Sequence, residues 1–207
     1  ALAGVSQPHL LELVSDDRLT VRGGGKGEEA VHTAVMRWVR LHPAAAEADV
    51  LIENFKVGGL KKYGLDYESL RAANPALVYC SITGFGQTGP RAHEAGYDFV
   101  VQAMSGFMAL TGEPAGQPMK MGISISDLTC GLYAVIGIQA ALAMRERTGR
   151  GQHVDMALLD CSVGLLASQA THFFTTGENP PRMGNEHAQV SAYGVFPVAD
   201  GEVVLAP

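Results

Sequence analysis

The chain has 207 residues, 47% hydrophobic and 17% charged, with a formal net charge of −6. This composition is typical of a globular protein that can bury a core, and the acidic balance argues against nucleic acid as a main partner. The three cysteines form no CxxC pair, residues 1–9 show no signal-peptide pattern, and the longest apolar stretch, residues 130–144, is short for a bilayer. We therefore expect a reducing, cytoplasmic setting without membrane attachment.

Strands and helices are predicted to alternate from residue 49 onward. The buried, β-branched runs that predict strands are residues 49–52, 77–83 and 153–158. The segments that predict helices are residues 59–63, 67–73, 97–110, 128–147 and 160–175. Residues 84–90 hold three glycines and a proline and predict a loop. Near the end, Ala199-Asp200-Gly201 predicts the turn of a hairpin between residues 193–198 and 202–206.

This alternation predicts an α/β fold with a Rossmann-like parallel sheet and flanking helices. Ligands of such sheets bind outside the carboxyl ends of the strands. Asn54 and Phe55 follow one predicted strand, and Gly84 and Gly86 follow the next. Asn54 and Phe55 could also simply end a strand, and the glycine loop could be a plain turn, since it lacks the Lys-Ser/Thr ending of a phosphate-binding loop.

Asp127 is the strongest single candidate for chemistry. It lies in Ser124-Ile125-Ser126-Asp127, directly before an apolar run at helical spacing. Free N–H groups and the dipole of a helix N-terminus favour an ionised carboxylate, which can attack an activated acyl group. The alternative is ordinary helix capping, because Ser and Asp are common N-cap residues.

Other chemistries find little support. No His/Cys cluster has metal-site spacing, so we expect no metal, and no G-x-S-x-G elbow is present. His153 and Asp155 alternate on a predicted strand and are expected to face solvent. Cys130 is expected to be a small core residue.

Several motifs in a fixed order resemble one known family. They are Glu53-Asn54-Phe55, Asn74-Pro75, Gly84-Phe85-Gly86, Gly96-Tyr97-Asp98, the Asp127 segment and Arg182-Met183-Gly184-Asn185. From about residue 48 to residue 207 the chain resembles the class III CoA-transferases, a family that includes the α-methylacyl-CoA racemases.

The resemblance implies a role for particular residues. Asp127 matches the family's catalytic aspartate, which carries acyl groups through an aspartyl anhydride and an aspartyl-CoA thioester. Backbone amides at the helix start and in the glycine loops would stabilise the oxyanions. The residues implied to bind CoA are Asn54, Phe55, Lys56, Lys62 and Tyr97. Lys62 replaces a basic residue that is often Arg, and Val57 stands where a proline is usual. CoA and acyl-CoA are then substrates, a small carboxylic acid is the partner substrate, and no cofactor is held permanently.

The resemblance also implies a larger assembly. Residues 1–47 do not match, residues 48–190 form an incomplete large CoA-binding domain, and residues 191–207 form a hairpin leading towards a smaller domain. Family members form interlocked homodimers and begin with a strand that we do not find in residues 1–47. We therefore expect this chain by itself to self-associate and to show little turnover. The alternatives are a racemase, disfavoured because Tyr97 stands where racemases carry His, and a non-catalytic CoA-binding fragment.

Overall fold

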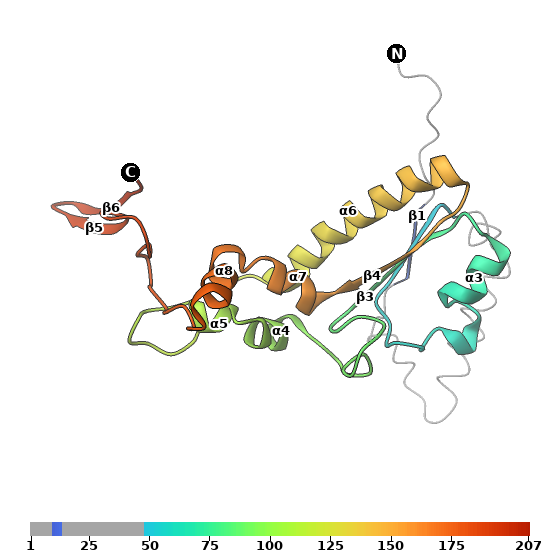
Figure 1. Cartoon of the computed structure of the whole chain (residues 1–207), viewed down its shortest axis with the longest axis horizontal. Coiled ribbons are helices and arrows are strands. Elements are labelled where there is room, and N and C mark those ends of the chain that lie inside the picture. The colour runs from blue at the N-terminus through green and yellow to red at the C-terminus, as the bar shows by residue number, and fades with distance from the viewer. Residues whose placement is uncertain (1–9, 14–47) are drawn as a thin grey trace, which may run out of the picture. The chain divides into compact units, whose positions relative to one another are not determined.

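The computed structural model describes residues 10–13 and 48–207 of the chain (Figure 1). These residues divide between two compact units. Of the described residues, the first unit comprises 10–13, 48–96 and 130–158, and the second comprises 97–129 and 159–207. One helix, α6 (Ile125–Thr148), begins in the second unit and continues in the first.

A parallel sheet forms the centre of the first unit. Its strands, in spatial order, are β1 (Leu10–Leu13), β2 (Val50–Glu53), β3 (Val78–Thr83) and β4 (His153–Ala157). All three pairings are parallel, and the register places Glu53 opposite Ser81. This confirms the predicted parallel α/β fold. Strand β1 lies in the segment where the sequence analysis found no strand. Four residues carry too little periodicity to identify a strand, and pairing with β2 defines it.

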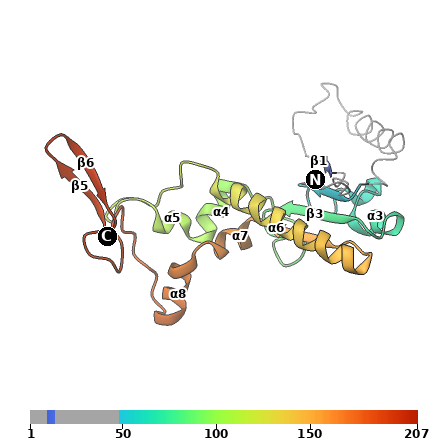
Figure 2. The same cartoon turned by 90° about the horizontal axis from the view of Figure 1, so that it is seen from above.

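Helices α3 (Tyr67–Ala73) and α6 cover opposite faces of this sheet (Figures 1 and 2). Side chains alternate across a strand, so each strand contributes to two cores. Val50, Val78 and Cys80 pack against Ala134, Ile138 and Ala141 of α6. The opposite core contains Ala48, Leu51, Leu77 and Tyr79, with Tyr67 and Leu70 of α3 against it.

Helix α6 is longer than the sequence predicted. It has 24 residues and a mean hydropathy of 1.5 over an 18-residue window, so by length and composition alone it could cross a membrane. Packing explains the apolar residues of one face, because Cys130, Ala134, Ile138 and Ala141 are buried in the described structure, whereas Leu132 and Ile136 are exposed. Small residues on this face let α6 approach the sheet closely. The expected core position of Cys130, which is 0% exposed, is confirmed.

The loops of the first unit follow local rules. Asp66 caps α3 by accepting a hydrogen bond from the Ser69 N–H, and α3 ends before Asn74-Pro75, as predicted. In place of the predicted helix over residues 59–63 there is a single 3₁₀ turn, η1 (Lys61–Tyr63). Gly64 ends that turn in the left-handed conformation, where a glycine is favoured.

Two predicted helices of the second unit are each broken in two. The helix expected over residues 97–110 is α4 (Asp98–Ser105) followed by α5 (Phe107–Leu110), because Gly106 adopts a φ of 99°. The helix expected over residues 160–175 is α7 (Leu158–Gly164) and α8 (Ala167–Thr176). The hairpin is confirmed as antiparallel β5 (Gly194–Val198) and β6 (Gly201–Leu205). Val198 pairs with Gly201, so its tight turn consists of Ala199 and Asp200.

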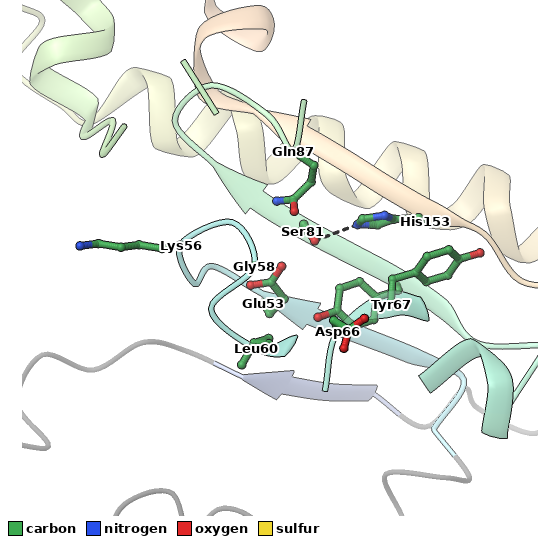
Figure 3. Close-up of a pocket in the computed structure, with 10 residues that line it drawn as sticks. Glu53, Lys56, Gly58, Leu60, Asp66, Tyr67, Ser81, Gln87 and His153 are labelled. Atoms are coloured by element: carbon green, nitrogen blue, oxygen red, sulfur yellow. Dashed lines mark hydrogen bonds between the residues drawn. The ribbon is translucent and has the colours of Figure 1, made fainter. Parts of the chain in front are cut away.

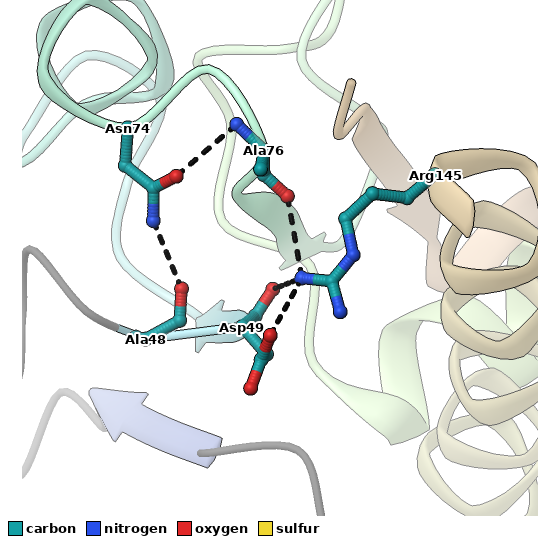
Figure 4. A network of polar contacts seen from close by, with 5 residues as sticks. All are labelled: Ala48, Asp49, Asn74, Ala76 and Arg145. Carbon is teal, nitrogen blue, oxygen red and sulfur yellow. Dashed lines mark hydrogen bonds and ion pairs between the residues drawn. The ribbon is translucent and has the colours of Figure 1, made fainter. Parts of the chain in front are cut away.

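Arg145, near the end of α6, ties that helix to the amino ends of β2 and β3 (Figure 4). Its Nη1 lies 2.7 Å from Asp49 Oδ1, and the two side chains are 21% and 29% exposed. The same nitrogen also donates to the Ala76 carbonyl at 3.4 Å. Asn74 completes the network by donating to the Ala48 carbonyl and accepting from the Ala76 N–H.

Arg145→Met is expected to lower the free energy of unfolding by about 1–3 kcal/mol, because a partly buried charged hydrogen bond is lost. Methionine keeps the apolar part of the side chain, so the fall in unfolding free energy measures the contribution of the charged guanidinium. Arg147→Met is the control, since Arg147 is exposed on the same helix, and about 0.5 kcal/mol or less is expected there. Urea unfolding measures both. Equal losses in the two variants would contradict this role for Arg145.

Candidate functional site

The segment after β2 holds three of the residues singled out by the sequence. Asn54 and Lys56 are exposed and Phe55 is half-buried. The Lys56 carbonyl accepts a hydrogen bond from the Gly59 N–H at 2.8 Å, which closes a turn. Gly58 occupies this turn with a φ of 74°, where a glycine is favoured. The turn therefore forms although Val57 stands in place of the expected proline.

Lys62 lies on the 3₁₀ turn that follows. Its side chain is exposed, and its Nζ is 4.8 Å from the centroid of the Tyr63 ring. A hydrogen bond from the Lys61 N–H to the Gly58 carbonyl joins this turn to the preceding one. Asn54, Phe55, Lys56 and Lys62 thus belong to one continuous, hydrogen-bonded strand-end segment of the first unit.

A polar hollow lies beside this segment in the first unit (Figure 3). The residues that line it include Glu53, Lys56, Asp66, Tyr67, Ser81 and His153. Glu53 is 5% exposed and Ser81 is 1% exposed, so two polar side chains are buried side by side in the sheet register. Glu53 and Ser81 are not among the site residues that the sequence predicted. The only available signal was that Glu53 belongs to the Glu53-Asn54-Phe55 motif.

His153 is half-buried and takes part in this hollow, so the expectation that it faces solvent was wrong. Its Nε2 lies 2.8 Å from Ser81 Oγ. The Tyr67 ring stacks on the imidazole at 4.8 Å between centroids, and the Tyr79 ring meets it edge-on at 5.3 Å. The aromatic partners come from α3 and β3, which sequence spacing on β4 alone could not reveal.

Burial shifts the protonation of Glu53 and His153 towards the neutral form. Burial raises the pKa of Glu53, while hydrogen bonds from Ser81 and from the Phe55 N–H oppose that rise. Burial lowers the pKa of His153, although the charges of Asp155 and Glu68 act in the opposite direction. A neutral imidazole at neutral pH is therefore favoured.

The glycine loop over residues 84–90 is a structured turn that binds a carboxylate of the protein itself. The Gly86 N–H donates to Thr83 Oγ1, and the Gln87 N–H lies 2.9–3.0 Å from both carboxylate oxygens of Asp155. Asp155 is exposed, as expected, yet its carboxylate is engaged by this loop. Of the readings left open by the sequence, this geometry favours a tight loop over a phosphate cradle.

Asp127 is the third residue of α6 and is exposed in the second unit. Partial shielding from water raises its pKa, and the nearby Asp98 carboxylate raises it further. Shielding and Asp98 therefore oppose the expected effect of the helix N-terminus, which favours the ionised carboxylate. Asp98 Oδ1 accepts the Ser126 N–H at 2.9 Å, so a second carboxylate already occupies the helix N-terminus.

Several expected oxyanion donors at the helix start already have partners. The Ile125 N–H donates to the Ile123 carbonyl, the Leu128 N–H to the Ser124 carbonyl, and the Ser126 N–H to Asp98. These three N–H groups already donate hydrogen bonds within the protein, which differs from the expectation that the helix start offers them to an oxyanion.

Tyr97 precedes Asp98 at the start of α4, and its side chain is 70% exposed. The Asp98–Ser126 hydrogen bond brings the backbone at Tyr97 close to the backbone at Asp127, although 30 positions separate them in sequence. Gln102, which is 0% exposed, supports this arrangement by donating to Asp98 and accepting from the Met121 N–H. Asp98 and Gln102 are residues that the sequence analysis did not select.

Chemically, an exposed carboxylate at a helix start is suited to nucleophilic attack, and exposed lysines are suited to anions. Within residues 10–13 and 48–207, no group of three or more His, Cys, Asp or Glu side chains could hold a metal ion.

Comparison with known proteins identifies consistent relatives. A model of CoA-transferase family III matches residues 41–207. A succinate–glutarate CoA-transferase of Agrobacterium fabrum is 60% identical over 159 residues, which are 77% of this chain and 40% of that protein. An acetyl-CoA:oxalate CoA-transferase of Acetobacter aceti is 44% identical over 160 residues, 77% of this chain and 41% of that protein.

Among solved structures, the crystal structure of a CAIB/BAIF family protein from Brucella suis superposes with a TM-score of 0.76 at 56% identity. The match covers 86% of this chain and 46% of that one. The chain thus spans about two fifths of the length of the two curated relatives and under half of this structure.

Proposed function

Since this chain belongs to CoA-transferase family III, we propose that it forms the part of an acyl-CoA:carboxylate CoA-transferase that carries the nucleophile, Asp127. The observation that carries the proposal is the exposed Asp127 carboxylate in the first turn of α6. The names of the similar proteins support dicarboxylic acids, with succinate and glutarate as the first to test. A cytoplasmic location and a homodimer stay predictions.

The proposed reaction needs no external acid, base or cofactor. The Asp127 carboxylate attacks the thioester carbonyl, the C–S bond breaks, and CoA leaves as a thiolate from an aspartyl anhydride. The thiolate then attacks the Asp127 carbonyl carbon, releasing the donor acid as a carboxylate and leaving an aspartyl-CoA thioester. The acceptor carboxylate repeats these two steps in reverse, which returns Asp127 to its ionised form.

The raised pKa of Asp127 fits this role. A carboxylate of higher pKa is a more basic nucleophile once it is ionised. Asp98 and partial shielding from water both destabilise the charge on Asp127, and forming an acyl bond removes that charge. The same environment therefore favours the covalent intermediates over the resting carboxylate.

CoA is proposed to bind along the strand-end segment through Asn54, Phe55, Lys56 and Lys62, with Tyr97 as a further contact. This segment follows the carboxyl end of β2, the edge of a parallel sheet where ligands bind. Exposed Lys56 and Lys62 supply positive charge for the phosphates of the nucleotide. Holding CoA by its nucleotide keeps the thiolate in place while the acids exchange.

Lys62→Ala is expected to weaken CoA binding by about 1–2 kcal/mol, because one partly screened phosphate contact is lost. Calorimetry with CoA measures the change, and Lys61→Ala is the matched control from the neighbouring exposed position. Dephospho-CoA identifies which phosphate is involved. An unchanged affinity in Lys62→Ala, or the same loss in both variants, would refute the placement of the nucleotide.

Trapping the covalent intermediate tests the proposed function. The natural full-length protein is mixed with succinyl-CoA, and intact mass spectrometry is expected to show a mass gain equal to CoA less one water, as a thioester requires. Hydroxylamine should remove the adduct, borohydride should reduce the thioester, and peptide mapping should place the modified residue at Asp127. Adduct formation at another residue overturns the assignment. Deuterium uptake at the α-carbon of a 2-methylacyl-CoA without CoA transfer would favour a racemase.

A further inference from the structure

Glu53 is a buried carboxylate for which the proposed chemistry has no use. It is 5% exposed at the last position of β2, directly before Asn54 and Phe55. Among the residues that the structure describes, no Lys or Arg forms an ion pair with it. A carboxylate is costly to bury unless hydrogen bonds compensate, so its partners indicate what it does.

The first partner of Glu53 is the segment proposed to bind CoA. Glu53 Oε2 accepts the Phe55 N–H at 2.7 Å, a length typical of a charge-assisted hydrogen bond. The β2–β3 ladder ends at the pair Glu53 and Ser81, so no strand pairing orients the Phe55 peptide group. The Glu53 side chain takes over this task where the strand stops.

The second neighbour of Glu53 is Ser81, its register partner on β3. Ser81 is 1% exposed, and its Oγ lies 2.8 Å from His153 Nε2. The stacked Tyr67 and edge-on Tyr79 hold the imidazole, and the hydrogen bond between Ser81 and His153 joins β3 to β4 (Figure 3).

We propose that Glu53, supported by Ser81 and His153, is a positioning residue that holds the backbone of Asn54–Lys56 in the conformation that binds CoA. Glu53 acts through the Phe55 peptide group and does not touch CoA. This inference rests on the proposed function, because it assigns a role in CoA binding at the same segment.

Three variants of the natural full-length protein test the proposal. Glu53→Ala removes the acceptor for the Phe55 N–H, whereas Glu53→Gln keeps an amide oxygen that can accept it. Glu146→Ala is the control, because Glu146 is exposed on α6. The dissociation constant of CoA, KM for acyl-CoA, kcat and Tm are measured for each variant well below its Tm.

In Glu53→Ala the dissociation constant and KM are expected to rise about tenfold, the factor for one lost hydrogen bond to a charged group. The value of kcat at saturation should stay within about twofold, because the chemistry at Asp127 is untouched. Glu53→Gln should restore most of the affinity, and Glu146→Ala should match the unaltered protein. A purely structural role would lower Tm in Glu53→Ala and leave the affinity of the folded protein unchanged, which would overturn the proposal.

Hydrogen exchange in the unaltered protein gives a second test that does not depend on any variant folding. The Phe55 amide should be strongly protected, whereas exchange at the rate of an unstructured peptide would overturn the proposal. These measurements distinguish failure of the positioning role from failure of the proposed function. Absence of CoA binding by the unaltered protein overturns the proposed function as well. Normal CoA binding by both the unaltered protein and Glu53→Ala overturns the positioning role alone.

Discussion

Asp127→Asn is expected to abolish CoA transfer, lowering turnover by several orders of magnitude while the fold and CoA binding persist. The amide is a poor nucleophile and cannot form the anhydride. The side chain is exposed and nearly isosteric with asparagine, so stability should change little. Transfer of CoA from succinyl-CoA to glutarate, followed by chromatography, measures turnover. Calorimetry with CoA verifies that the substrate site is intact.

Asp160→Asn is the matched control for this loss. Asp160 is also exposed in the first turn of a helix, α7, so it shares the helix position of Asp127 without the proposed role. Its turnover should equal that of the unaltered protein. A well-folded, contaminant-free Asp127→Asn protein with near-normal turnover would remove Asp127 from the mechanism.

The pH dependence of turnover in the unaltered protein also tests the role of Asp127 as the nucleophile. Asp127 must be ionised to attack, so kcat/KM should fall as the pH drops through its pKa. Because partial shielding from water and Asp98 raise that pKa, this fall should begin at a higher pH than for an ordinary aspartate. An acid limb at or below the usual aspartate range would contradict the effect of this environment.

Gly84→Ala is expected to destabilise the first unit by about 3 kcal/mol or more, because a new methyl group has no space. A Cβ at Gly84 would collide with Gly96 Cα and lie 2.7 Å from Gly96 N. Both obstacles are backbone atoms, so no side chain can turn away. The loop after β3 and the chain leading to Tyr97 would have to separate, which would also disturb the contact of Gln87 with Asp155.

Gly131→Ala provides the control in the opposite direction. Gly131 lies in α6, and a Cβ there would meet nothing within 4 Å. Alanine has the higher helix propensity, so a gain of up to about 1 kcal/mol is expected. Urea unfolding of both variants measures the two changes. A stable Gly84→Ala protein would show that the two backbone segments do not cross as closely as the structure places them.

The elements that the sequence predicted well are those set by local rules. The runs around Leu51 and Val78 are buried on both faces, a pattern that indicates interior strands, and Asn74-Pro75 stops α3 where predicted. The helix breaks at Gly106 and before Ala167 were missed. Glycine adopts both helical and left-handed backbone conformations, so the presence of Gly106 alone does not predict that the helix ends there.

The residues of the candidate site likewise divide into those that local sequence predicts and those that only tertiary contacts reveal. The sequence by itself determined the parallel α/β class, the position of Asn54 and Phe55 after a strand, and Asp127 near a helix start, because each depends on neighbours within a few residues. Only the tertiary structure decided that Glu53 lies beside Ser81, that Ser81 meets His153, and that Asp98 meets the N-terminus of α6. These contacts join residues up to 72 positions apart. Strand register and helix packing create such contacts, and neither leaves a periodic signal in a single sequence.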